Sequence, residues 1–87
     1  MQDTQSTKDQ IRQWVQETAE RKGLGAVTDA ESLTENGVID SLAIFRLVSF
    51  LEDTFGIRIA DEEIVNDNFK SVDDIDRLVQ SKLGSKV

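Results

Sequence analysis

Residues 40–56 read DSLAIFRLVSFLEDTFG, and this stretch decides the fold. Its apolar side chains recur three and four residues apart, as they do on one face of a helix, and polar side chains occupy the opposite face. The apolar positions are Leu42, Phe45, Leu47, Val48, Leu51 and Phe55, and Ile44 and Phe50 widen the face. We therefore predict a central helix over Asp40–Phe55 that ends at Gly56.

Two further amphipathic helices are predicted on either side of this one. The first runs from Thr7 to Lys22, with Ser6 as its cap and Gly23 as its stop. Its apolar stripe contains Ile11, Trp14, Val15, Thr18 and Ala19, which predicts that Trp14 belongs to the core. The last helix runs from Val72 to about Leu83 and is capped by Ser71 with Asp74. Its stripe is Ile75, Leu78, Val79 and Leu83.

The remaining segments lack a sustained period. Residues 23–40 are rich in turn formers and predict a long loop, which Leu24, Val27, Leu33 and Val38 could pin to the core. Residues 57–59 predict an extended connector, and residues 61–65 one short helix or turn. The chain of 87 residues is thus expected to form one all-α domain over 1–87, with its core at about 7–83.

The composition excludes several classes of function. There is no Cys and no His, so disulfides, thiolate or imidazole metal ligands, a Cys nucleophile and a Ser-His relay are all ruled out. An independent enzyme is therefore disfavoured. The net charge of −7 disfavours nucleic acid as a partner. It is compatible either with steering toward basic protein surfaces or with simple solubility.

No metal site and no membrane segment are expected. The acidic runs 61–63 and 73–76 lack the spacing of a calcium loop and are interpreted as solvated faces. The longest apolar-rich stretch is too short to span a bilayer, and no secretory signal is recognisable. We expect a cytoplasmic protein without membrane insertion.

Ser41 is the candidate functional residue. Asp40 is a strong helix-capping type, which puts Ser41 at the first helical position, where unpaired backbone N–H groups and the helix dipole favour an anion such as a phosphate ester. Val38, Ile39, Leu42 and Ile44 form an apolar surround in the sequence. An Asp-Ser pair at a helix start is also common for capping alone, so these residues leave both interpretations open.

The wider pattern resembles the acyl carrier protein family. The resemblance lies in ENGVIDSL at 35–42, LVSFLEDTFGI at 47–57, IADEE at 59–63 and SVDDI at 71–75, and it covers about residues 8–83. It implies a small four-helix bundle with a long first loop and a short third helix. It also implies that a transferase moves 4'-phosphopantetheine from coenzyme A onto Ser41, with Asp40 as the acidic neighbour. The thiol of that arm would then hold an acyl group as a thioester.

The sequence departs from this family pattern beside Ser41. Ala43 and Arg46 stand where carriers of fatty-acid synthesis are commonly acidic, and Ala60 stands where the family often has Pro. The run VIDS at 38–41 looks more like D-alanyl, aryl or peptidyl carriers, which implies a dedicated biosynthetic pathway. The predicted partner-facing residues are Val38, Ile39, Leu42, Ala43, Ile44 and Arg46.

Two functions are therefore weighed. In the first, a monomeric carrier meets a phosphopantetheinyl transferase, an acyl- or aminoacyl-loading enzyme and downstream acyl-transfer enzymes. In the alternative, an unmodified helical adaptor docks partner proteins through its acidic surface. A gain of one phosphopantetheine in intact mass separates the two.

Overall fold

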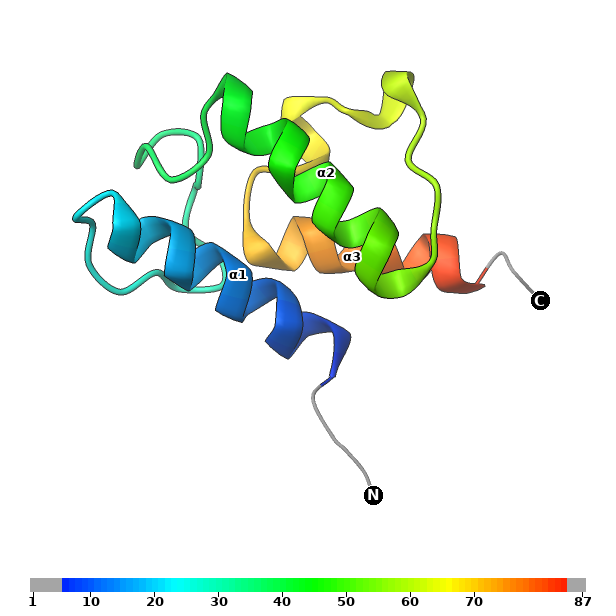
Figure 1. Ribbon diagram of the computed structural model, residues 1–87, viewed down its shortest axis with the longest axis horizontal. Coiled ribbons are helices and arrows are strands. Elements are labelled where there is room, and N and C mark those ends of the chain that lie inside the picture. Colours follow the sequence, from blue (N-terminus) through cyan, green and yellow to red (C-terminus); the bar gives the residue numbers. More distant parts are fainter. Residues whose placement is uncertain (1–5, 85–87) are drawn as a thin grey trace.

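A computed structural model describes residues 6–84, and in this range the chain is all-helical (Figure 1). The α-helices are α1 (Thr7–Arg21), α2 (Ser41–Phe55) and α3 (Val72–Gly84), and two short 3-10 helices, η1 (Asp61–Glu63) and η2 (Asn66–Asn68), lie between α2 and α3. The all-α prediction is confirmed. Each long helix matches its predicted range to within a residue at either end.

The predicted helix caps also form. The Asp9 N–H donates to the Ser6 hydroxyl at 3.1 Å, and the Asp74 N–H donates to the Ser71 hydroxyl at 3.2 Å. These bonds satisfy N–H groups that have no partner within the first turn of a helix. Gly56 ends α2 with φ +65°, a left-handed conformation that glycine adopts without the steric cost of a Cβ.

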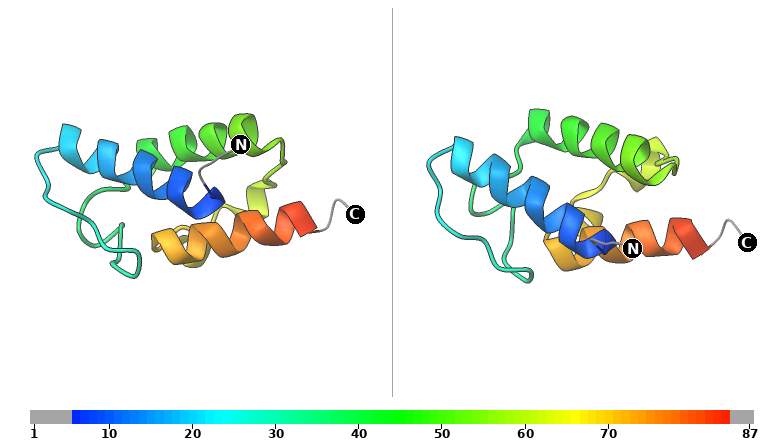
Figure 2. Two further views of the ribbon diagram at one scale, coloured as in Figure 1. Left: turned by 90° about the horizontal axis from the view of Figure 1, so that it is seen from below. Right: turned by 60° about the horizontal axis from the view of Figure 1, so that its bottom comes forward.

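The core lies among the three helices. In the left view of Figure 2, α1 and α2 lie above α3, and in the right view α1 runs from the level of α2 at its end to the level of α3 at its start. The largest fully buried side chains come from all three helices and from the connecting segments, and they are Phe69, Ile11, Leu33, Leu47, Leu51, Ile75, Val15, Val38, Val72 and Val79. Burial of these apolar surfaces is the main force that holds the helices together.

The long loop between α1 and α2 is pinned to the core, as its apolar residues predicted. Leu33 is fully buried and its N–H donates to the Lys70 carbonyl at 2.7 Å. Val38 is also fully buried, and Leu24 and Val27 pack partly against the core. The loop thereby brings the start of α2 beside the end of α1, which the two views of Figure 2 show at the same end of the molecule.

The segment between α2 and α3 consists of an extended connector followed by two 3-10 turns. Ile57 and Ile59 are buried while Arg58 is exposed, which confirms the extended connector. The predicted short helix or turn at 61–65 is represented by η1, and η2 adds a second 3-10 turn. The four-helix bundle that the resemblance implies is therefore not confirmed. Over residues 6–84 there are three α-helices, and two 3-10 turns lie between α2 and α3, where the short third helix is expected.

Candidate functional site

Ser41 is the first residue of α2 and is exposed to solvent. Among residues 6–84, neither its hydroxyl nor its backbone N–H has a hydrogen-bond partner. The positive end of the helix dipole lies at this position. The structure thus presents a free primary hydroxyl in a place where a negatively charged substituent is favoured.

Both oxygens of the Asp40 carboxylate form hydrogen bonds that fix the start of α2. Oδ1 accepts from the N–H groups of Leu42 at 3.1 Å and Ala43 at 2.8 Å, which confirms the predicted cap. Oδ2 accepts from the Lys22 ammonium at 3.0 Å. The pKa of Asp40 is lowered from its ordinary value because the Ala43 N–H, and after it Lys22, stabilise the charged carboxylate.

Lys22 connects this cap to the end of α1. It is the C-cap residue of α1, and its ammonium donates to the carbonyl of Gly37 at 3.1 Å as well as to Asp40. Gly37 has φ +87°, a conformation that favours glycine, in the turn just before α2. In the same turn the Val38 N–H donates to Asn36 Oδ1 at 3.0 Å. These contacts hold Ser41 in a defined place relative to α1.

The structure corrects three of the predicted partner-facing residues. Val38, Ile39 and Ala43 are 0%, 4% and 7% exposed, so they face the interior and offer a partner almost no surface. Val38 and Ile39 precede the cap on a loop that turns inward, and the Ile39 N–H donates to the Leu33 carbonyl at 2.9 Å. Ile39 and Ile44 occupy the positions of a hydrophobic staple around the cap, and Ile44 is half-buried against the core.

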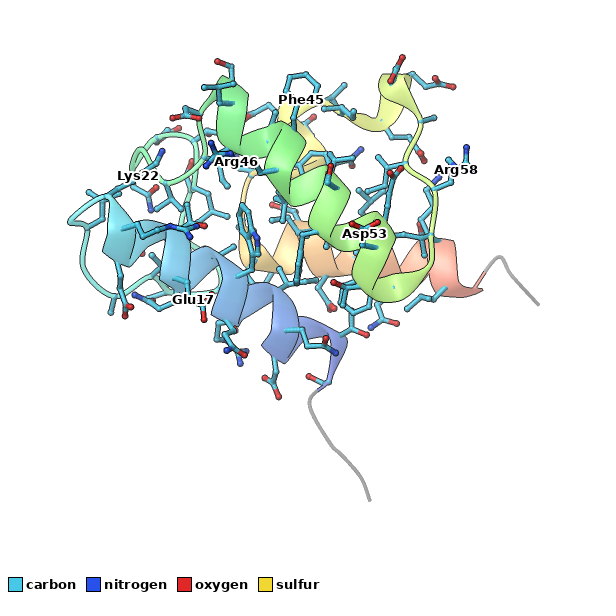
Figure 3. The ribbon with its side chains drawn as sticks, in the orientation of Figure 1. Glu17, Lys22, Phe45, Arg46, Asp53 and Arg58 are labelled. Carbon is cyan, nitrogen blue, oxygen red and sulfur yellow. The ribbon has the colours of Figure 1, made fainter. Side chains whose placement is uncertain are left out.

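The other predicted residues remain accessible. Leu42 is 71% exposed, and Arg46 is also exposed. The sequence interpretation missed Phe45, which it assigned to the apolar face of the helix but which is 61% exposed. Figure 3 shows Phe45 on the outer side of α2 and Arg46 toward the side where Lys22 lies. The apolar face of α2 that the sequence predicts is wider than the stripe that is buried. Phe45 is an apolar residue of that face that lies outside the buried stripe.

Trp14 is only partly buried, contrary to a simple core position. Its ring stacks on Phe50 with the ring centroids 5.9 Å apart, and it packs against the core cluster. Trp14 also lines a groove whose other residues come from the end of α1 and the start of α2. Trp14 therefore combines the predicted core role with a place at the surface near the start of α2.

The described residues lack two other kinds of functional feature. Over residues 6–84, no group of three acidic side chains is arranged to hold a metal ion. No helix in that range is long and apolar enough to cross a membrane.

These features define a helical protein that displays a free serine hydroxyl at a helix start and whose sequence has no His or Cys to activate it. Comparison with known proteins agrees with this class. The chain is 36% identical over 72 residues to an acyl carrier protein homolog of Mycoplasmopsis pulmonis (strain UAB CTIP), a match that covers 83% of this chain and 94% of that protein. No protein-family model matches the chain. The chain belongs to the acyl carrier protein family, whose members are carriers and not enzymes.

Proposed function

We propose that the protein carries an acyl or aminoacyl group as a thioester on a 4'-phosphopantetheine arm attached to Ser41. The observation on which this rests is the exposed, unbonded Ser41 hydroxyl at the first position of α2, in a chain of the acyl carrier protein family. When bound, the arm supplies a thiol for the cargo. The chain supplies attachment, a fixed orientation and a surface for partners.

The residues around Ser41 fit this modification. The hydroxyl is exposed, and no hydrogen bond to residues 6–84 has to break before it reacts with a transferase's substrate. Ser41 Oγ would form a bond to the phosphorus of coenzyme A that carries the pantetheine. The bond from that phosphorus to the adenosine bisphosphate portion would break, and the hydroxyl proton would pass to a base of the transferase. Asp40 stays in its cap throughout because its carboxylate is already bonded on both oxygens.

The proposed partners of the carrier are a phosphopantetheinyl transferase, a loading enzyme and acyl-transfer enzymes of a dedicated biosynthetic pathway. Arg46 supports a pathway other than housekeeping fatty-acid synthesis, because it places a cation on the accessible side of α2. The segment with η1 and η2 takes the place of the family's short third helix within the four-helix bundle.

The test is the intact mass after incubation with a broad-specificity phosphopantetheinyl transferase, coenzyme A and Mg²⁺. The wild-type chain should gain one phosphopantetheine, and Ser41→Ala should gain none. Ser41→Ala should keep its fold, with a free energy of unfolding within about 0.5 kcal/mol of wild type, because Asp40 still caps the helix.

The matched control is Ser49→Ala, which removes another exposed serine from the same helix and should load like wild type. A wild-type chain that gains no mass would contradict the carrier function and favour the unmodified adaptor. Loading of Ser41→Ala would contradict the assignment of the site.

A further inference from the structure

The cap at the start of α2 leaves little room for a second anion on the helix amides. The carboxylate of Asp40 already accepts from the N–H groups of Leu42 and Ala43, and the Ile44 N–H donates to the Asp40 carbonyl at 3.0 Å. Of the first amides of α2, only that of Ser41 itself has no partner in residues 6–84. A phosphodiester on Ser41 carries a full negative charge, so it needs further donors from outside the helix start.

A groove of about 300 Å³ between α1 and the first half of α2 lies next to this position. Two of its lining residues, Asp40 and Leu42, are the chain neighbours of Ser41. Its lining is made of apolar surface from both helices and of three cationic side chains, and the residues are Trp14, Thr18, Arg21, Lys22, Asp40, Leu42, Ala43 and Arg46. The groove thus combines apolar surface with three cationic side chains.

Two of the three cations are available to a ligand. Lys22 is neutralised by Asp40. Arg21 and Arg46 form no ion pair with any carboxylate between residues 6 and 84, although the chain has seventeen acidic residues. Within the described part of the chain, the guanidinium of Arg21 makes only one hydrogen bond, a 3.4 Å contact with the Thr18 hydroxyl. In Figure 3, Arg46 extends from α2 toward the side of Lys22, while Glu17 lies on another part of α1. With Lys22 and Asp40 balanced, the groove has a net charge of about +2 within an acidic protein.

We propose that this groove holds the proximal part of the phosphopantetheine arm, an inference that rests on the proposed modification of Ser41. Arg21 and Arg46 bind the phosphodiester oxygens, since guanidinium groups form charge-assisted and often bidentate hydrogen bonds with phosphate. The branched, apolar pantoyl group that follows the phosphate packs on Trp14 and Leu42. The arm then leaves the groove with only its distal, thiol-bearing part free to reach partner enzymes.

Trp14 makes the proposal measurable, because it is the only Trp of the chain. The experiment compares the unmodified chain with the fully loaded chain, whose loading is established by intact mass. The readouts are Trp14 fluorescence, its quenching by acrylamide, and the ³¹P chemical shift of the phosphodiester. Loading should change the emission and reduce the quenching, and the ³¹P signal should differ from that of free phosphopantetheine.

The double variant Arg21→Gln with Arg46→Gln should load fully after longer incubation but lose most of the change in emission and in ³¹P shift. The matched control is Arg58→Gln, an exposed arginine on the connector after α2 that does not line the groove. This variant should behave as wild type. Raising the salt concentration should reduce the response of wild type and leave that of the double variant unchanged.

The outcomes separate the two proposals. No mass gain in wild type would overturn the proposed function itself. Full loading without a Trp14 response, or with a response that survives loss of both arginines, would overturn the groove proposal and leave the function intact. A response that appears only after an acyl group is attached to the thiol would also overturn it, because the groove would then hold the cargo.

Discussion

Phe45 and Leu42 expose large apolar side chains in the first turns of α2, close to Ser41. Apolar side chains gathered beside a functional group commonly mark a contact surface, and large aromatic side chains supply much of the binding energy at such surfaces. Arg46 extends the same helix with a cation. At the scale of single residues, the site thus offers a partner an apolar contact flanked by positive charge.

Phe45→Ala should weaken recognition by the transferase without weakening the fold. We expect kcat/KM for phosphopantetheine transfer to fall about tenfold, which corresponds to roughly 1.4 kcal/mol. The free energy of unfolding should change by no more than about 0.5 kcal/mol, because the side chain is mostly solvated. The control is Val65→Ala, which removes an exposed apolar side chain from the connector that holds η1 and η2. Equal effects of the two substitutions would argue against a contact at Phe45.

The sequence predicts the local features of the site and misses the non-local ones. The cap by Asp40 and the place of Ser41 depend on neighbours within three residues, so residue types alone suffice. The burial of Ile39 and Ala43 depends on the path of the long loop and on the position of α1, which periodicity does not encode. The sequence predicts Val38 both as a residue that pins the loop to the core and as a partner-facing residue, and its full burial agrees with the first prediction. The ion pair of Lys22 with Asp40 joins residues that are 18 positions apart, and no pattern indicates it.

At the scale of elements, Asp29 ties the long loop to two helices. Its carboxylate accepts two hydrogen bonds from Arg12 of α1, both at 2.8 Å, and its carbonyl accepts from the Asp73 N–H of α3 at 3.0 Å. Arg12, and to a smaller extent Lys8, lowers the pKa of Asp29 below its ordinary value. A loop without helical structure thereby gains a fixed path toward the start of α2.

Asp29→Asn should destabilise the fold by about 1 kcal/mol near neutral pH, a value typical of a partly exposed charge pair. A lowered pKa in the folded state means that the carboxylate adds stability above its unfolded pKa of about 3.9 and loses that contribution as the pH falls further. The difference between variant and wild type should therefore shrink toward zero under strongly acid conditions. Urea unfolding of both proteins over a pH series measures this difference in the free energy of unfolding.

Asp53→Asn is the control for this series, because Asp53 is exposed on α2 and has no ion pair within residues 6–84. It should leave stability nearly unchanged at each pH. A difference between Asp29→Asn and wild type that persists unchanged into strong acid would exclude the charge pair as its cause.

The segment between α2 and α3 forms two 3-10 turns where the sequence predicts one short helix or turn. Side-chain groups there bond to the local backbone and compete with regular helical bonds. Glu63 Oε1 accepts from the Ala60 N–H at 2.9 Å, and Asn68 donates to the Glu63 carbonyl at 2.7 Å. These bonds favour two short 3-10 turns over one α-helix, and no apolar period in the sequence signals the difference.

At the scale of the whole molecule, the negative charge is unevenly distributed. Residues 29–67 contain ten acidic and two basic residues, a local net charge of −8, and they include all of α2 and η1 and the first two residues of η2. Mutual repulsion among these charges opposes the compact state. The Debye length is about 8 Å at physiological ionic strength, which is comparable to charge spacings on a small protein.

Moderate salt should therefore raise the melting temperature of the unmodified chain. Calorimetry or circular dichroism across a NaCl titration measures the effect, and divalent cations should act at lower concentration because they screen more strongly. The ion pairs of α1 weaken in salt, but exposed pairs contribute little to stability. A constant or falling melting temperature would contradict the account of repulsion.

The arrangement of the helices also decides how the protein can be tethered. In Figure 1 the start of α2 lies at the top of the molecule, whereas the start of α1 lies at the bottom and the end of α3 at the right. A surface, an affinity tag or a neighbouring module joined to either of these ends would leave the approach to Ser41 open. The same architecture can therefore serve as a carrier that diffuses freely or as one domain of a longer, covalently linked chain.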